Sequence, residues 1–227
     1  MRAGYWPRRI VRNAGILIVA LLVHLVVVTA TSHSRQVMYR LSMATGYASV
    51  ALIAWALLIG PWRVRAGRAS PVSTDLRRDV GIWGGLFALA HVVTGLQVHL
   101  TGHMLKYFLY QDDKHAVPVR YDLFGFANWT GLAATLVIVM LVAISNDASL
   151  RALGTRRWKS WQRWTYWMAA LVVAHTLAYQ LPARQHGVYI GVFSLAVVTV
   201  TAFQLEGRRR VLANVRRDGS PTAAAPS

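Results

Sequence analysis

The sequence predicts an all-α integral membrane protein, a six-helix transmembrane bundle with both termini in the cytoplasm. Three observations support this fold class. The 227 residues are 55% hydrophobic and only 15% charged, whereas soluble domains carry about 25% charged residues. The apolar residues gather in runs of about 20, the length that a helix needs to cross a bilayer. The 25 Lys and Arg residues, against 8 Asp and Glu, concentrate between those runs, as in multi-pass membrane proteins.

Six segments qualify as membrane spans, at residues 10–30, 44–60, 80–100, 125–145, 162–182 and 186–206. Gly60-Pro61, the Gly-, Ser- and Pro-containing stretch 67–74 and Pro182 separate some of them. We therefore expect residues 1–206 to form one domain. Residues 207–227, rich in Arg and then in Ala, Pro and Ser, are expected to be a basic, disordered cytoplasmic tail. No internal repeat is evident.

The distribution of cations predicts the orientation. The N-terminus, the second and fourth loops and the C-terminal tail hold 19 of the Lys and Arg residues, and the other three loops hold 6. The positive-inside rule then places both termini in the cytoplasm. We expect the membrane to be a bacterial-type inner membrane. Topology and anionic lipid headgroups account for the basic charge, so no nucleic-acid partner is needed.

Composition also excludes several kinds of site. The chain has no Cys, which rules out disulfides, iron–sulfur clusters and thiolate metal sites. All eight carboxylates fall in predicted loops or at helix ends, whereas a proton-coupled transporter normally carries an acidic residue within a span. The sequence contains no Ser-His-Asp, Gly-rich phosphate or zinc motif and no flavin or nicotinamide domain.

Three of the eight histidines, His24, His91 and His175, lie well inside predicted spans, whereas the other five lie at or beyond the outer ends. An ionisable residue at membrane depth is costly unless it pairs, lines a cavity or binds a ligand, and the simplest alternative is a hydrogen bond to a neighbouring helix. His91 shares a helix face with small residues, including Ala88 and Gly95. Such a face permits close helix packing and also leaves room for a flat porphyrin. The other five histidines are interpreted as solvated.

The depths of His91 and His175 match. The third and fifth helices run in the same direction under the predicted topology, and the two histidines differ in depth by only about 3 Å at 1.5 Å per residue. Two imidazoles at similar height suit the two axial positions of one haem, and bis-His ligation favours electron transfer because no coordination position stays open. His24 lies at a similar depth and is the competing ligand, although its helix lacks the small-residue face.

Several motifs resemble the ferric-reductase-like transmembrane domain family, and most closely its MsrQ-type haem-binding membrane subunits. The resemblance covers about residues 44–182 and depends on the order and spacing of moderately specific motifs. In the first half these are Thr45-Gly46, Gly60-Pro61-Trp62, Arg77-Arg78-Asp79-Val80-Gly81 and His91. In the second half they are Ser145-Asn146-Asp147, Leu153-Gly154, Arg157-Trp158-Lys159-Ser160-Trp161, Tyr166 and His175.

The resemblance implies a six-helix protein that carries b-type haem and passes electrons across the bilayer. His91 and His175 match the family's outer haem ligands, which are axial ligands of the iron. Family members often have a second His thirteen residues before the position of His175, where this chain has Gln162. Arg77 or Arg78 fills the corresponding place before His91, so Arg78 is a weaker cofactor-binding candidate. We expect one haem b per chain.

The resemblance also implies separate redox partners. The donor would be a flavin reductase or a quinol, although no motif supports a flavin or quinone site within the chain. A flavoprotein could dock on the basic inner face, which holds Arg77, Arg78, Arg156, Arg157, Lys159 and Arg163. An outer-face acceptor would meet the loop 101–124. It would be a periplasmic oxidoreductase that repairs methionine sulfoxide if the chain is MsrQ-like, or a ferric or cupric ion if it is metalloreductase-like.

Two alternatives of other classes stay open. A haem-free six-helix transporter would use the intramembrane histidines to line a path, with transport sensitive to pH near the His pKa of about 6.5. A haem-free membrane assembly subunit would stabilise a complex without redox chemistry of its own.

Four tryptophans at three-residue spacing, Trp158, Trp161, Trp164 and Trp167, could relay electrons, but we expect them to be interfacial anchors.

Overall fold

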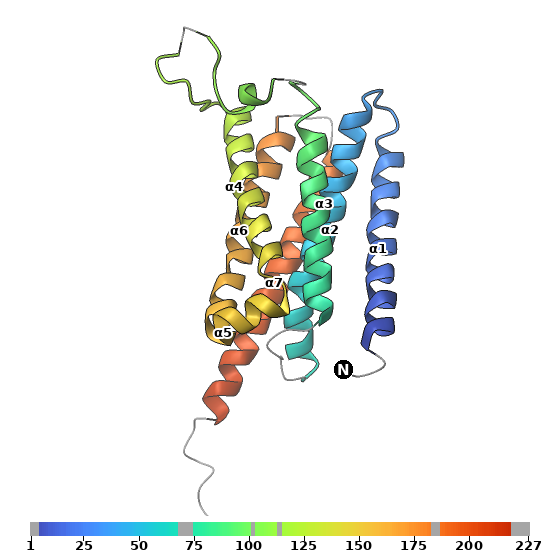
Figure 1. Ribbon diagram of the computed structural model, residues 1–227, viewed down its shortest axis with the longest axis vertical. Helices are drawn as coiled ribbons and strands as arrows, with labels where there is room; N and C mark the ends of the chain where they lie inside the picture. Colours follow the sequence, from blue (N-terminus) through green and yellow to red (C-terminus); the bar gives the residue numbers. More distant parts are fainter. Residues whose placement is uncertain (1–4, 68–74, 101–102, 113–114, 183–186, 219–227) are drawn as a thin grey trace, which may run out of the picture.

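The computed structural model describes residues 5–67, 75–100, 103–112, 115–182 and 187–218. These residues are almost entirely helical and include no strand beyond one isolated bridge between Leu109 and Val119. The elements in chain order are α1 (Tyr5–Ala30), α2 (Val37–Arg65), α3 (Asp75–Gly95), the 3₁₀ turn η1 (Met104–Tyr107), α4 (Leu123–Ala143), α5 (Asp147–Gln162), α6 (Trp164–Gln180) and α7 (Gly187–Asp218). Figure 1 shows the long helices side by side, with α5 across one end.

Four helices are long and apolar enough to cross a membrane, over residues Pro7–Ala30, Val37–Arg65, Leu123–Ala143 and Gly187–Asn214. These helices make the chain a multi-pass membrane protein. The other two predicted spans are also helical, but they are less apolar or shorter. α3 begins with four charged residues among its first five, and α6 has only 17 residues.

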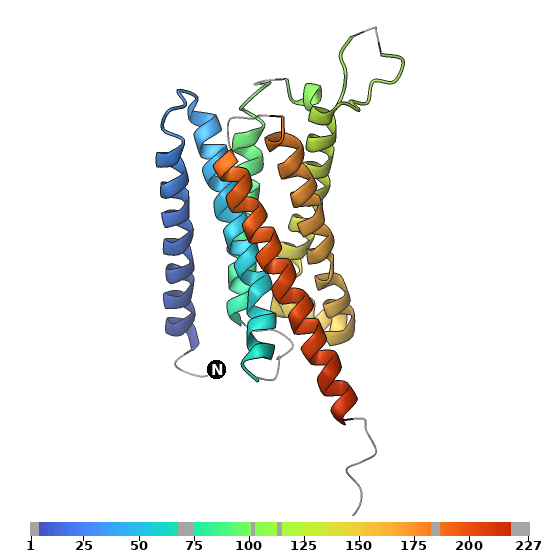
Figure 2. The same cartoon turned by 180° about the vertical axis from the view of Figure 1, so that it is seen from behind.

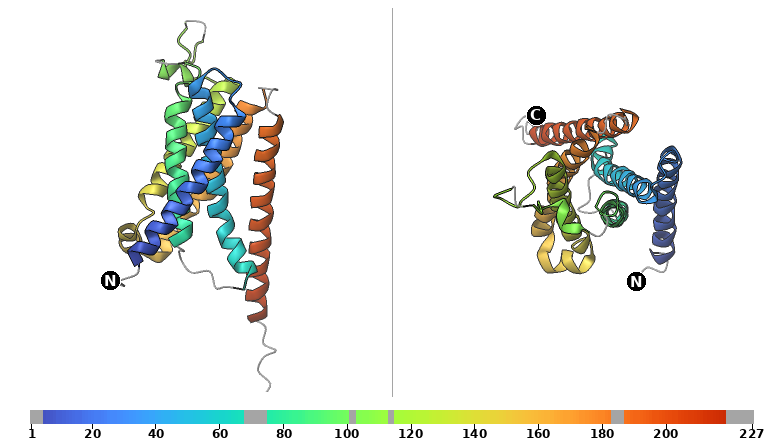
Figure 3. Two further views of the ribbon diagram at one scale, coloured as in Figure 1. Left: turned by 90° about the vertical axis from the view of Figure 1, so that its right-hand side faces the viewer. Right: turned by 90° about the horizontal axis from the view of Figure 1, so that it is seen from above.

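α2 occupies the centre of one half of the molecule, where it packs against α1, α3 and α7. α4 packs against α6 in the other half, and the contact between α3 and α4 joins the halves. The view from above in Figure 3 shows α1 at the edge of this arrangement. Figure 2 shows α7 crossing the back of the molecule diagonally. The four helices α2, α3, α4 and α6 therefore surround the middle of the bundle.

Small residues let these helices approach one another closely. On α3, a Cβ at Gly84 would lie 3.1 Å from Ile53 Cγ1 of α2, and the carbonyl of Gly84 accepts a hydrogen bond from Ser49 Oγ at 2.9 Å. Farther along α3, Ala88 packs with Ile138 of α4 in a buried apolar cluster. The small-residue face predicted for this helix therefore contacts both neighbours.

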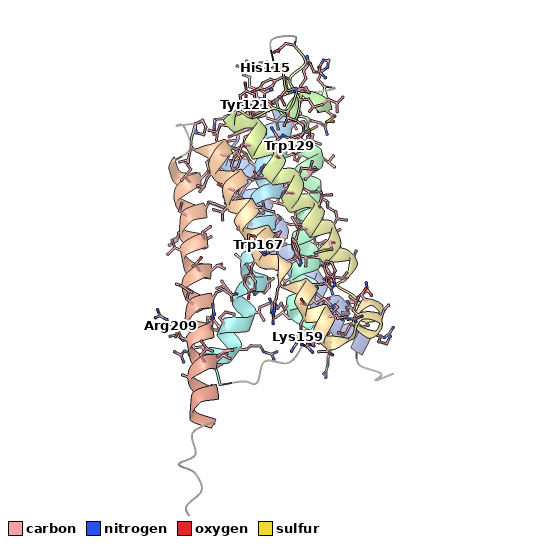
Figure 4. All side chains as sticks on the ribbon, turned by 90° about the vertical axis from the view of Figure 1, so that its left-hand side faces the viewer. His115, Tyr121, Trp129, Lys159, Trp167 and Arg209 are labelled. Atoms are coloured by element: carbon pink, nitrogen blue, oxygen red, sulfur yellow. The ribbon has the colours of Figure 1, made fainter. Side chains whose placement is uncertain are left out.

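The molecule has two chemically different ends. The end that carries α5, here called the α5 end, also holds the start of α1 and the last turns of α7, and Figure 4 shows Lys159 and Arg209 there. The opposite end, here called the η1 end, carries η1 and the segment 96–122, with His115 and Tyr121 beyond the helices.

α5 turns at Gly154, whose φ of 69° favours glycine. The buried Trp158 fixes α5 by donating from Nε1 to Ile144 O at 2.9 Å.

Several boundaries differ from those predicted. Gly60-Pro61 does not end the second span, because α2 continues through Pro61 to Arg65. The fourth loop contains α5, a polar helix that hydropathy does not detect because it lies across the bundle end. α3 ends at Gly95 instead of residue 100, since the Tyr107 hydroxyl donates to Leu96 O and accepts from the backbone N–H groups of His99 and Leu100. α7 continues past residue 206 to Asp218, so the first part of the predicted disordered tail is helical. Residues 219–227 lie outside the described residues.

Candidate functional site

A cavity of about 420 Å³ lies among α2, α3, α4 and α6. Its volume falls within the range of about 300–1,000 Å³ typical of ligand pockets. Most of its wall is apolar, and Phe193 of α7 closes one side. His91 and His175 both line it.

His91 is held by α2. Its Nδ1 lies 2.8 Å from the carbonyl oxygen of Ser42 and 3.3 Å from Ser42 Oγ. The ring packs directly on Gly46, where a Cβ would lie 2.9 Å from Nδ1. With Nδ1–H donating to the carbonyl, the neutral imidazole keeps the lone pair of Nε2 available. That Nε2 atom makes no hydrogen bond within the described residues.

His175 is held by α4 in the same way. Its Nδ1 lies 2.7 Å from the carbonyl oxygen of Ala127, and a Cβ at Gly131 would lie 2.7 Å from the same nitrogen. Its Nε2 likewise has no hydrogen-bond partner among the residues that the structure describes. A metal-ligating histidine usually donates its other ring N–H to a carbonyl or carboxylate in this manner, which fixes the tautomer and the ring orientation.

The two halves of the site repeat one arrangement. In each, the first helix of an antiparallel pair supplies a carbonyl and, four residues later, a glycine, and the second helix supplies the histidine. The histidine follows the carbonyl residue by 49 positions in α2–α3 and by 48 in α4–α6. No repeat is evident in the sequence, because neighbouring side chains differ and a backbone carbonyl has no residue identity of its own.

The structure brings His91 and His175 together. Their ring centroids are 6.1 Å apart and their planes are nearly perpendicular, at 84°. The equal depth expected from the sequence thus corresponds to direct proximity. Because each Nδ1 is bound to its own neighbouring helix, the two rings present their remaining edges to a shared space.

Residues that the sequence does not single out complete the η1 end of the cavity. Tyr179 lies one helical turn beyond His175, with ring centroids 5.2 Å apart, and its hydroxyl donates to Asn128 Oδ1 at 2.7 Å. The ring of His99 stacks on Tyr179 at 6.1 Å and 12°. His99, which the sequence predicts to be solvated, lines the mouth of the cavity while remaining exposed.

The weaker candidates lie elsewhere. His24 is on α1, outside the residues that line the cavity, and its buried Nδ1 has no hydrogen-bond partner in the described part of the chain. Arg78 lies 13 residues before His91, about 20 Å along α3. It forms ion pairs with Asp147 and Asp75 at the α5 end, and its hydrogen bond lowers the pKa of Asp147 below the ordinary value. Gln162 ends α5, also outside the cavity lining, and His186 lies outside the described residues.

The four tryptophans do not form one buried row. Trp158 is buried and bonded to Ile144. Trp161, Trp164 and Trp167 are 43%, 45% and 67% exposed, and Figure 4 shows Trp167 on the side of the bundle. Exposed indoles of this kind suit contact with lipid and headgroups better than a relay through the interior.

The loop expected to meet an acceptor projects from the η1 end (Figure 1). Tyr110 stacks on His115 at 3.7 Å, and His115 Nδ1 lies 2.6 Å from Asp112. Arg120 binds Asp122, which caps α4 through Gly125 N, and this pairing lowers the pKa of Asp122. Lys114, part of the same loop, lies outside the described residues.

No protein-family model, no curated protein and no solved structure matches the chain.

Proposed function

We propose that this chain is a b-type haem protein of the cytoplasmic membrane that transfers electrons from a separate donor to an acceptor on the outer face. The observation that carries the proposal is the His91–His175 pair, with 6.1 Å between ring centroids inside a cavity. Two imidazoles that face one cavity with Nδ1 already bonded fit axial ligation through Nε2.

The separation of the rings supports ligation of one ion by both histidines. A metal–imidazole bond is about 2 Å long, and the ligating nitrogen lies about 1 Å from its ring centroid. Two in-line ligands would therefore place the centroids about 6 Å apart, close to the 6.1 Å observed. A simple hydrogen bond between the imidazoles does not explain the pair, because both N–H groups already donate to carbonyls.

The donor set fits a cofactor that brings ligands of its own. An ion held by two imidazoles needs further ligands, and a porphyrin supplies four nitrogens in one plane. When bound, haem supplies one-electron redox chemistry. The chain supplies the two imidazoles and the apolar walls, which include Ile53, Ile138 and Val172. We expect one haem b per chain.

The charge distribution supports the proposed orientation of the protein in the membrane. In the proposed topology α1, α2, α3, α4, α6 and α7 all span the membrane, and the basic α5 end, with both termini, faces the cytoplasm. That end would receive electrons from a flavoprotein, whereas a quinol would donate from within the bilayer. The η1 end would face the periplasm and its acceptor, an oxidoreductase or a metal ion.

The test is a reduced-minus-oxidised absorption spectrum of the purified full chain, with haem quantified per polypeptide. We expect a b-type spectrum and about one haem per chain in the wild type. His91→Ala and His175→Ala should each lose the spectrum, because one imidazole alone leaves the ion underligated.

His24→Ala is the matched control, since this intramembrane histidine lies outside the cavity lining; it should retain the haem. If His24→Ala lost the haem and His175→Ala retained it, His24 would be the iron ligand in place of His175. A colourless wild-type protein would reject the proposal and favour a haem-free transporter or assembly subunit.

A further inference from the structure

The cavity is mainly apolar at one end and polar at the other. Its deep end, toward the α5 end of the molecule, is lined by Ile53, Ala88, Ile138 and Val172. The hydroxyls of Ser49 and Thr135 also line this region, but both already donate to backbone carbonyls. One to two helical turns toward the η1 end, the lining becomes polar, with Tyr39, His99, Tyr107, Asn128, Tyr179 and Gln180. His91 and His175 lie between the two regions. The cavity is therefore shaped for a ligand that has one apolar edge and one polar edge.

Most polar groups at the η1 end of the cavity are already bonded to the protein. The Tyr107 hydroxyl bonds to three backbone groups. Asn128 donates to Phe124 O and accepts from Tyr179. The imidazole of His99 differs, because it only stacks on Tyr179 and packs edge-on against Phe124. Neither of its ring nitrogens has a hydrogen-bond partner among the described residues, so a ring N–H is available to a ligand.

We infer that the η1 end binds the carboxylate edge of the porphyrin and that His99 donates a hydrogen bond to a propionate. This inference rests on the proposed function. A carboxylate turned toward Ile53 and Ile138 would be buried without a partner, which is strongly unfavourable. At the mouth of the cavity the same carboxylate meets water and an imidazole N–H, and such charge-assisted bonds are about twice as strong as neutral ones.

The structure holds His99 in a fixed relation to the iron-ligating position. Its backbone N–H donates to Tyr107 at 3.2 Å, and its ring stacks on Tyr179. Tyr179 is in turn fixed by Asn128 at 2.7 Å and lies 5.2 Å from His175. This aromatic series sets the distance between the ligand that would bind the iron and the group that would bind the propionate.

The experiment compares haem with its dimethyl ester, in which both carboxylates are capped, bound to the haem-depleted full chain in detergent. We expect the wild type to bind haem about tenfold or more tightly than the ester, the value of a hydrogen bond to a charged group. His99→Ala should lose this preference, and His99→Gln, which keeps a donor, should retain part of it. His103→Ala, an exposed histidine in the same segment and outside the cavity lining, should behave as wild type.

A second readout is the midpoint potential of the bound haem. His99→Ala should lower it, because an unpaired propionate charge favours the ferric state, and His103→Ala should leave it unchanged. Equal affinity of the wild type for haem and ester would overturn the inference while leaving the proposed function intact. So would a preference retained in His99→Ala. Failure of the wild type to bind either porphyrin would reject the proposed function itself. If His99→Ala does not fold, the wild-type comparison and His99→Gln still decide.

Discussion

Each candidate histidine is fixed mainly by a backbone carbonyl. The carbonyls of Ser42 and Ala127 accept the Nδ1–H, and Gly46 and Gly131 provide the space for the rings. A helical carbonyl cannot rotate away as a carboxylate side chain can, so both the tautomer and the ring plane are set before any ligand binds. Preorganised ligands of this kind require glycine at two particular positions.

Replacing either glycine should damage the site. In Gly46→Ala and Gly131→Ala the new Cβ would lie 2.9 Å and 2.7 Å from the imidazole Nδ1, closer than packing permits. The ring must move and lose its bond to the carbonyl. We expect each variant to lose about 1–3 kcal/mol of stability, as overpacked cores do, measured by unfolding in mixed detergent micelles. Haem content should fall in parallel.

Gly81→Ala on α3 is the matched control, since nothing lies within 4 Å of its Cβ position. Glycine is the poorest ordinary helix former, so this change should stabilise the protein by up to about 1 kcal/mol. If Gly46→Ala and Gly131→Ala were as stable as Gly81→Ala, the close contact between histidine and glycine would be wrong.

The sequence identifies the two histidines but not what holds or surrounds them. An imidazole within an apolar run stands out because its burial is costly, whereas a backbone carbonyl has no identity in a sequence. His99 lies just beyond α3, so hydropathy gives no reason to place it on a cavity. The offsets from Gly46 to His91 and from Gly131 to His175, 45 and 44 residues, were the signal that could have revealed the repeated arrangement.

α1 packs mainly against α2, and one buried carboxylate ties it to α3. Asp79, on the second turn of α3, is almost fully buried and binds Arg9 at 3.1 Å and Arg12 Nε at 2.8 Å. Asn13 also donates to Asp79 and accepts from Trp83 Nε1. The contact with α2 is apolar and centres on a buried cluster that includes Ile16 and Leu52. The ionic cluster therefore determines how α1 is aligned against α3.

Removing the charge of Asp79 should detach or loosen α1. In Asp79→Asn the two arginines keep their positions but lose the carboxylate, and breaking a buried ion pair from one side costs several kcal/mol. Arg9 and Arg12 are each about a quarter exposed, which reduces the penalty, so we expect a loss of about 2–4 kcal/mol. Unfolding in mixed micelles measures it.

Asp75→Asn provides the comparison for this prediction. Asp75 lies one turn earlier on α3 and also pairs with arginine, but its side chain is 41% exposed. Exposed ion pairs contribute less than about 1 kcal/mol, so this variant should be nearly as stable as the wild type. Equal effects of the two substitutions would contradict a special role for the buried carboxylate.

Hydropathy predicts the elements that lipid or the core surrounds and misses those at the ends. All six predicted spans coincide with helices, because apolar runs of that length have few other stable conformations in a bilayer. α5 was missed because polar residues such as Arg156 and Lys159 dominate it and only Trp158 is buried. The end of α3 was overestimated, since the terminating contact comes from Tyr107, a residue twelve positions farther along the chain.

Considered as a whole, the molecule separates its charge along the bundle. Among residues with described positions, arginines and lysines line the α5 end, from Arg8 on α1 to Arg210 on α7. The η1 end carries few, including Lys106 and Arg120. This asymmetry underlies the proposed orientation. It depends on α3 and α6 crossing the membrane, and these two helices are the ones that carry His91 and His175.

Single-cysteine labelling should test both crossings without background, because the chain contains no Cys. Exposed residues bracket each helix, Ala66 and Val117 around α3, and Ser160 and Leu181 around α6. We expect a membrane-impermeant maleimide to label Val117→Cys and Leu181→Cys in cells with a permeabilised outer membrane and an intact inner membrane. Ala66→Cys and Ser160→Cys should react only after the inner membrane is opened, since the basic end is retained in the cytoplasm.

Each result of this labelling bears on a different part of the topology. Labelling of Ala66→Cys together with Val117→Cys would mean that α3 does not cross, and would leave His91 without a place in the membrane. Reversed labelling of all four positions would keep both crossings but invert the molecule, so that the cytoplasm would face the aromatic loop 103–122. The cavity mouth lies near that loop, so inversion would also exchange the proposed donor and acceptor sides.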